Sequence, residues 1–188
     1  MRPRLILGVV ATMCVVLAAG WFTFRSGAPA TGQMSVQGDA VPAKVLPLKP
    51  PRVAPSGHIE YRNEHYRFSL FYPEGLQVKE IDEGPDTATI TFQNVATAQG
   101  FQIFIVPYGE QQVSEERFRQ DVPSGVRQKP LDVTIDGVTA ASFYSSNAML
   151  GDTAEIWFVS GGYLFEVTTL KALSGWLSQI MMSWEWQV

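Results

Sequence analysis

The chain has few of the residues that build metal sites and nucleophilic active sites. Its 188 residues include one cysteine and two histidines. A single cysteine, Cys14, rules out an intrachain disulfide, a zinc site made of cysteines and a CxxC redox motif. His58 and His65 do not form a metalloprotease motif, and no serine lies in a GxSxG elbow. The composition therefore predicts a protein that is not an enzyme and has no cofactor.

Charged residues are absent from residues 5–24, which lie between Arg2 and Arg4 on one side and Arg25 on the other. About 20 apolar residues form a helix long enough to cross a bilayer. The extra positive charge before this run predicts a cytoplasmic N-terminus. We therefore expect a transmembrane anchor within residues 1–25, and a single-pass membrane protein whose C-terminal domain is periplasmic or extracellular.

A cleaved signal sequence is the alternative to the anchor. Ala28-Pro29-Ala30 meets the small-residue rule for signal peptide cleavage. The protein would then be secreted after cleavage near Ala30.

Aromatic side chains are absent from residues 26–56, a segment that contains six prolines. Such a segment buries too little apolar surface to fold alone, so we interpret it as a flexible linker. The remaining residues, 57–188, are expected to form one domain.

Basic side chains are scarce beyond the linker. Residues 56–188 hold eight basic and 17 acidic side chains, a net charge of −9. Nucleic acids and anionic membrane surfaces are poor partners for such a domain. The expected partners are the membrane, through residues 5–24, and a protein of unknown identity.

Alternation of apolar and polar residues predicts antiparallel strands. Tyr66, Phe68, Leu70 and Tyr72 alternate with Arg67 and Ser69, and a second alternating run covers residues 87–93. Residues 101–108 are apolar on both faces, which favours a central strand. Asp136-Gly137 and Gly161-Gly162 lie between further strands and favour tight hairpin turns.

Two helices are expected among these strands. Ser114 is a suitable N-cap for a short helix that ends before Pro123. A second helix, within residues 171–183, has an apolar stripe formed by Leu173, Trp176, Leu177, Ile180 and Met181. The order of the elements predicts an α+β fold built on an antiparallel sheet.

Three sequence segments resemble the PsbP-like (Mog1/PsbP) group of domains. They are "YRNEHYRFSLFYPEG", "AEIWFVSGGYLFEVTT" and "IMMSWEW", and the resemblance covers about residues 58–188. It implies an antiparallel sheet flanked by helices, an α/β/α sandwich, and no enzymatic activity. Members of this group are extrinsic partners of photosystem II or accessories to its assembly, partners of a small GTPase, or anchored bacterial proteins.

Two sets of side chains are candidate functional residues. Glu80, Asp82, Glu83 and Asp86 crowd one turn and could supply oxygen ligands to calcium, although solvated acidic turns are common. Trp184 and Trp186 share one strand face, and one of them is a candidate for an exposed anchor that binds a partner.

We therefore expect a membrane-tethered, extracytoplasmic, non-enzymatic domain that binds a protein partner or supports a membrane complex. The alternative is a small-ligand carrier or hydrolase with a pocket between the sheet and a helix.

Overall fold

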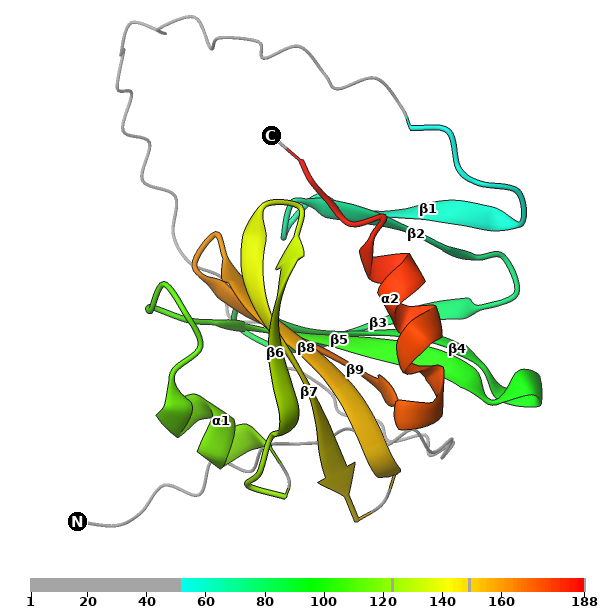
Figure 1. Ribbon diagram of the computed structural model, residues 1–188. Helices are drawn as coiled ribbons and strands as arrows, with labels where there is room; N and C mark the ends of the chain where they lie inside the picture. Colours follow the sequence, from blue (N-terminus) through cyan, green and yellow to red (C-terminus); the bar gives the residue numbers. More distant parts are fainter. Residues whose placement is uncertain (1–51, 123, 149, 188) are drawn as a thin grey trace, which may run out of the picture. The chain divides into compact units, whose positions relative to one another are not determined.

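The computed structural model describes residues 52–187, apart from 123 and 149. Its strands form two antiparallel sheets, one of seven strands and one of three (Figure 1). The large sheet has the order β3 (Gln77–Gly84), β4 (Thr87–Asn94), β5 (Gln99–Pro107), β9 (Tyr163–Leu170), β8 (Gly151–Ser160), β7 (Val138–Asn147), β6 (Gln128–Ile135). The small sheet has the order β1 (His58–Asn63), β2 (Phe68–Pro73), β10 (Glu185–Trp186).

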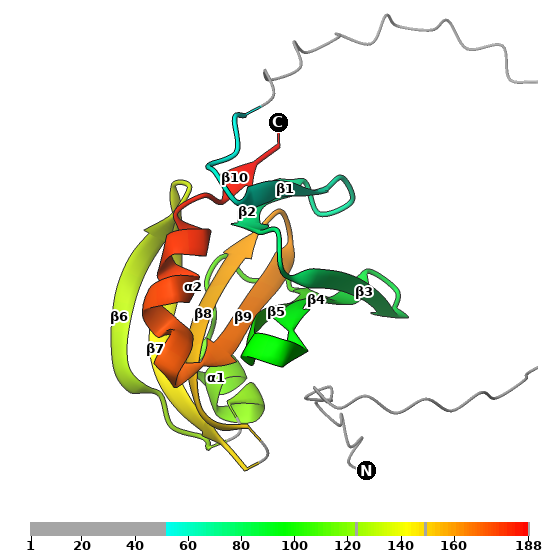
Figure 2. The same ribbon diagram turned by 90° about the vertical axis from the view of Figure 1, so that its right-hand side faces the viewer.

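Two short α-helices pack on opposite faces of the large sheet (Figures 1 and 2). In α1 (Glu115–Asp121), Phe118 packs with Trp157 of β8. In α2 (Ser174–Met181), Leu177 belongs to the cluster that contains Phe158 of β8. Neighbouring residues of a strand point to opposite faces, so the two helices cover different sides. A 3-10 turn (Lys171–Leu173) precedes α2, and another (Val95–Thr97) connects β4 to β5.

The small sheet lies on the same side as α2. Phe68 and Leu70 of β2 have no exposed surface and pack in one core cluster with Phe165 of β9 and Ile180 of α2. The fold is therefore α1, then the large sheet, then a layer that combines α2 with the small sheet.

Both predicted hairpin turns are confirmed. Asp136 and Gly137 connect β6 to β7 with φ angles of 40° and 83°. Gly161 and Gly162 connect β8 to β9 with φ angles of 60° and 86°. Two positive φ angles in succession are characteristic of the two-residue hairpin turn.

Both predicted helices are confirmed, including the cap of the first. The Ser114 side chain accepts a hydrogen bond from the backbone N–H of Arg117 at 3.2 Å. In the second helix Leu177, Ile180 and Met181 are buried, as their stripe predicts.

The first predicted strand differs from the structure. The prediction of a single sheet was wrong, because β1, β2 and β10 form a second one. The strand also begins at Phe68, since Arg67 lies in the preceding turn with a φ of 58°. Ser69, which the alternation places on the face opposite Phe68 and Leu70, is fully buried, and its hydroxyl accepts hydrogen bonds from Arg52 and Gln187.

The predicted strand at residues 101–108 is an interior strand, paired on both sides, although it does not lie in the exact middle of the sheet. These residues form most of β5, the third of the seven strands, and β9 occupies the middle. The chain leaves β5, builds β6 to β8 as a meander, and returns with β9 beside β5. Alternation along one strand carries no information about this return.

The predicted anchor, residues 5–24, lies outside the described residues. Within residues 52–187, apart from 123 and 149, no helix is long and apolar enough to cross a membrane. At the end of the predicted linker, Arg52 contacts the folded strands, so packing against the domain begins before the predicted boundary at residue 57.

Candidate functional site

The two tryptophans proposed as partner anchors both face the core. Trp184 is 3% exposed and stacks on Phe68, with ring centroids 4.1 Å apart. Trp186 is half-buried, and its ring lies 5.4 Å from both Trp184 and Phe165. The structure therefore contradicts an exposed anchor at Trp184, because the small sheet and β9 enclose the ring. Of the pair, Trp186 alone keeps a partly exposed side chain.

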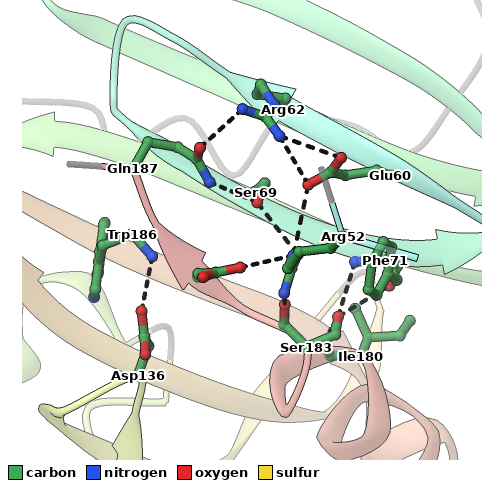
Figure 3. Close-up of polar contacts among 11 residues, drawn as sticks. Arg52, Glu60, Arg62, Ser69, Phe71, Asp136, Ile180, Ser183, Trp186 and Gln187 are labelled. Carbon is green, nitrogen blue, oxygen red and sulfur yellow. Dashed lines mark hydrogen bonds and ion pairs between the residues drawn. The ribbon is translucent and has the colours of Figure 1, made fainter. Parts of the chain in front are cut away.

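The C-terminal segment that carries these tryptophans is fixed by polar contacts (Figure 3). The backbone N–H of Trp186 donates to Asp136 in the β6–β7 turn at 2.8 Å. The Ser183 hydroxyl accepts from the N–H of Phe71 at 2.8 Å, beside β2. Gln187 accepts from Arg62 at 2.9 Å and donates to Ser69 at 2.8 Å.

Arg52 joins the segment to the small sheet from the other end of the domain's sequence (Figure 3). Its guanidinium donates to the Ser183 carbonyl at 2.7 Å, forms an ion pair with Glu185 at 2.7 Å and lies 4.3 Å from the Phe71 ring centroid. Arginine suits this position because its planar group can stack and hydrogen-bond together. The two ends of the described domain are thus held against each other.

The four acidic residues of the candidate calcium turn have separate partners. Glu80 accepts from the Tyr61 hydroxyl at 2.7 Å, and Glu83 accepts from the Thr89 hydroxyl at 3.0 Å. Asp82 accepts from the N–H of Gly84 at 2.9 Å, and Asp86 lies 3.5 Å from the His65 ring nitrogen. In the part of the chain that the structure describes, no three acidic, histidine or cysteine side chains are grouped to hold a metal ion.

A cavity of about 280 Å³ lies between α2 and the strands β7 and β8. Its polar lining includes the side chains of Ser142, Tyr144, Ser174 and Ser178, and its apolar lining includes Leu177. Its volume is at the lower end of the range for small-molecule pockets. The cavity lies between a helix and the sheet, where the pocket of a small-ligand carrier or hydrolase was expected.

The opposite face of the sheet holds three carboxyl groups beneath and beside α1. Glu155 of β8 is 5% exposed and accepts hydrogen bonds from Thr153, Thr168 and Trp157. Burial raises its pKa above the ordinary value for glutamate. Glu166 of β9 accepts from Arg117 of α1 at 3.2 Å, and Arg117 also pairs with Asp121.

The pKa of Glu166 is raised to about 8, first by burial and then by the negative charge of Asp121. Burial likewise raises the pKa of Asp121, while the charge of Arg117 lowers it. These side chains belong to elements far apart in the sequence. Neither "FEVTT" nor "ERFRQD" shows alone that Glu166 and Asp121 contact the same arginine.

Comparison with known proteins identifies the fold. No family model matches the chain, and no curated protein matches it. The solution structure of cyanobacterial PsbP (CyanoP) from Synechocystis sp. PCC 6803 superposes with a TM-score of 0.50 at 13% sequence identity. The match covers 71% of this chain and 95% of that one. The domain has a PsbP-like fold.

The expected PsbP-like fold is therefore confirmed. At 13% identity the likeness is one of fold, and it carries no residue's role from CyanoP to this chain. The contacts of Arg52, the hydroxyl-lined cavity and the carboxyl groups at α1 are therefore interpreted from the structure of this chain alone.

Proposed function

We propose that the chain is a membrane-tethered, extracytoplasmic, non-enzymatic protein whose PsbP-like domain binds a protein partner or supports a membrane complex. The likeness to CyanoP over 95% of that chain is the observation that supports this proposal most directly. The uncharged run at residues 5–24 supports the tether. The net charge of −9 over residues 56–188 favours a protein partner over a nucleic acid.

The proposed partner surface is the C-terminal segment around Met182 and Trp186. Met182 directly follows α2 and is 71% exposed. Trp186, four residues later, keeps part of its ring exposed. Methionine and aromatic side chains are enriched at protein interfaces.

Site-specific photocrosslinking in the native membrane tests this surface. A photoreactive amino acid replaces Met182 in one variant and Val95 in a control variant, because Val95 is similarly exposed at 74% but lies in the β4–β5 connection. We expect a discrete crosslinked partner from position 182 and none from position 95. Crosslinks from position 95 alone contradict the proposed surface, and none from either position contradicts partner binding itself.

The tether is tested by extraction of the membranes at alkaline pH and by N-terminal sequencing of the mature protein. An anchored chain stays in the membrane pellet and keeps residues 1–25. A soluble chain that starts near Ala30 shows that the N-terminus is a cleaved signal sequence.

The cavity beside α2 favours a second function, that of a small-ligand carrier. Its serine and tyrosine hydroxyls can hydrogen-bond a small polar molecule such as a sugar or polyol. Chemical shift changes of the full chain with a panel of small sugars and polyols test this function. We expect changes at Tyr144 and Ser178, and their loss in a Ser178→Leu variant; an unchanged spectrum with every compound rejects the carrier.

A further inference from the structure

Helix α1 is attached to the large sheet by two different sets of contacts. The apolar set stacks Phe118 on Trp157, with ring centroids 5.2 Å apart, and buries Val122 beside it. The polar set connects Arg117 and Asp121, which are four residues apart on the helix, to Glu166 of β9. A helix of seven residues is too short to be stable alone, so these contacts decide whether it stays docked.

The polar set is unbalanced in charge. Two carboxyl groups, Asp121 and Glu166, share one guanidinium, that of Arg117. Ionising both would leave a net negative charge in a site where the Glu166 side chain is 12% exposed. The lower-energy arrangement keeps a proton on one of the two carboxyl groups, and burial raises the pKa of both.

The other groups around this site do not correct the imbalance. On β8, Glu155 adds a third carboxyl whose three hydrogen-bond donors are all neutral. Tyr108, which follows β5, presents its ring to Arg117 at 5.9 Å. Arg127, which follows α1, lies over Phe118 at 3.9 Å and pairs with Glu115, so its charge is already used on the exposed side of the helix.

We propose that α1 is a proton-controlled flap, which docks firmly while the Asp121–Glu166 pair holds its proton and loosens as that proton is lost. Opening of the flap hydrates both carboxylates and exposes the apolar surface of Phe143, Trp157 and Leu164. The flap gives the domain two states that differ in exposed aromatic surface, and pH selects between them.

The direction of the pH effect follows from linkage. The pKa of Glu166 is about 8 in the docked state, against 4.5 for a hydrated glutamate. Between these values the open state releases a proton that the docked state keeps, so opening becomes about tenfold more favourable per pH unit. Above pH 8 both states are ionised and the effect levels off. The flap is thus tightest in acid and loosest at alkaline pH.

Hydrogen–deuterium exchange of the full chain from pH 5 to 9 tests the flap, with rates corrected against an unstructured peptide at each pH. We expect the protection of residues 115–121 to fall about tenfold per unit between pH 5 and 8 and then to level off. Residues 163–170 of β9 remain protected throughout. Glu166→Gln removes the contribution of one proton, a factor of about ten per pH unit, from the slope at α1. Glutamine can still accept from Arg117 but has no proton to lose in this pH range.

Glu116→Gln is the matched control, since Glu116 lies on the exposed face of the same helix. It must keep the wild-type slope. If Glu166→Gln fails to fold, Asp121→Asn gives the same test, because Glu166 then has Arg117 to itself and its ionisation no longer opposes docking. The proposal is overturned if the protection of α1 in the wild type does not change with pH. It is also overturned if Glu166→Gln or Asp121→Asn keeps the wild-type pH dependence of that protection.

Discussion

Replacement of Trp184 offers a sharp test of how the core is built. The ring is 3% exposed, stacks on Phe68 at 4.1 Å and meets Phe158 and Phe165 edge-on at 5.2 and 5.7 Å. Truncation of a buried tryptophan to alanine removes these contacts and leaves a cavity. We expect Trp184→Ala to lower the free energy of unfolding by about 4 kcal/mol.

Trp184→Phe separates the ring from its polar atom. The indole Nε1 is buried without a hydrogen-bond acceptor among the described residues. Phenylalanine keeps the stacking but removes this donor, which relieves about 1–3 kcal/mol. The smaller ring leaves a small cavity that costs about 1 kcal/mol. We therefore expect Trp184→Phe to be as stable as the wild type or up to about 2 kcal/mol more stable.

Urea unfolding of the full chain, followed by circular dichroism, measures both changes. Trp176→Phe is a suitable control, because Trp176 is half-buried and meets Phe101 at 5.9 Å at the edge of the core. If Trp184→Phe loses as much stability as Trp184→Ala, the buried indole N–H is not the cost that we infer. A loss below about 1 kcal/mol for Trp184→Ala would show that the ring is not part of the core.

Three further predictions concern Arg52, the β6–β7 turn and the buried carboxyl group of Glu166. Arg52→Ala should lower the unfolding free energy in urea by about 1–2 kcal/mol, a figure reduced for solvent screening because the side chain is 23% exposed. Arg62→Ala is the control, because its side chain is 41% exposed and its loss should change the unfolding free energy by under about 1 kcal/mol. Equal effects of the two substitutions contradict a special role for Arg52. Gly137→Ala should cost about 1–2 kcal/mol because its φ is 83°, and a thermal melt with no shift would argue against this turn. Glu166→Gln should raise the unfolding free energy by roughly 3 kcal/mol at pH 7 and by little at pH 4.5. The reason is that Glu166, with a pKa of about 8 in the folded protein, destabilises the fold as the pH rises from 4.5 to 8. A gain in stability that is the same at both pH values refutes this linkage.

The sequence predicts the local elements of this domain well because their signals are local. Asp136-Gly137 and Ser114 each determine a turn or a cap through their own backbone or side chain. The buried stripe of α2 follows from helical periodicity. Each of these features depends on neighbours within a few positions.

The errors arise where distant segments meet. Alternation places Ser69 on the polar face of its strand, but it is buried in the middle strand of the small sheet, where Arg52 and Gln187 from the two ends of the domain donate to its hydroxyl. The sequence around Trp184 is compatible with either a core or a surface position, and only the structure shows that its ring is buried and stacked on Phe68. The carboxyl pair at α1 joins residues 45 positions apart, Asp121 and Glu166, and no spacing rule in one sequence connects them.

The order of strands in the large sheet also determines how the chain can fold. Among the described strands of this sheet, β3-β4-β5 and β6-β7-β8-β9 are two meanders in which each strand pairs with its neighbour in sequence. The two meanders join along β5 and β9, where Phe101 is paired with Thr169. Closing this seam brings together residues that are far apart in the chain, and such contacts slow folding. The seam between β5 and β9 is therefore where we expect the rate of folding to be decided.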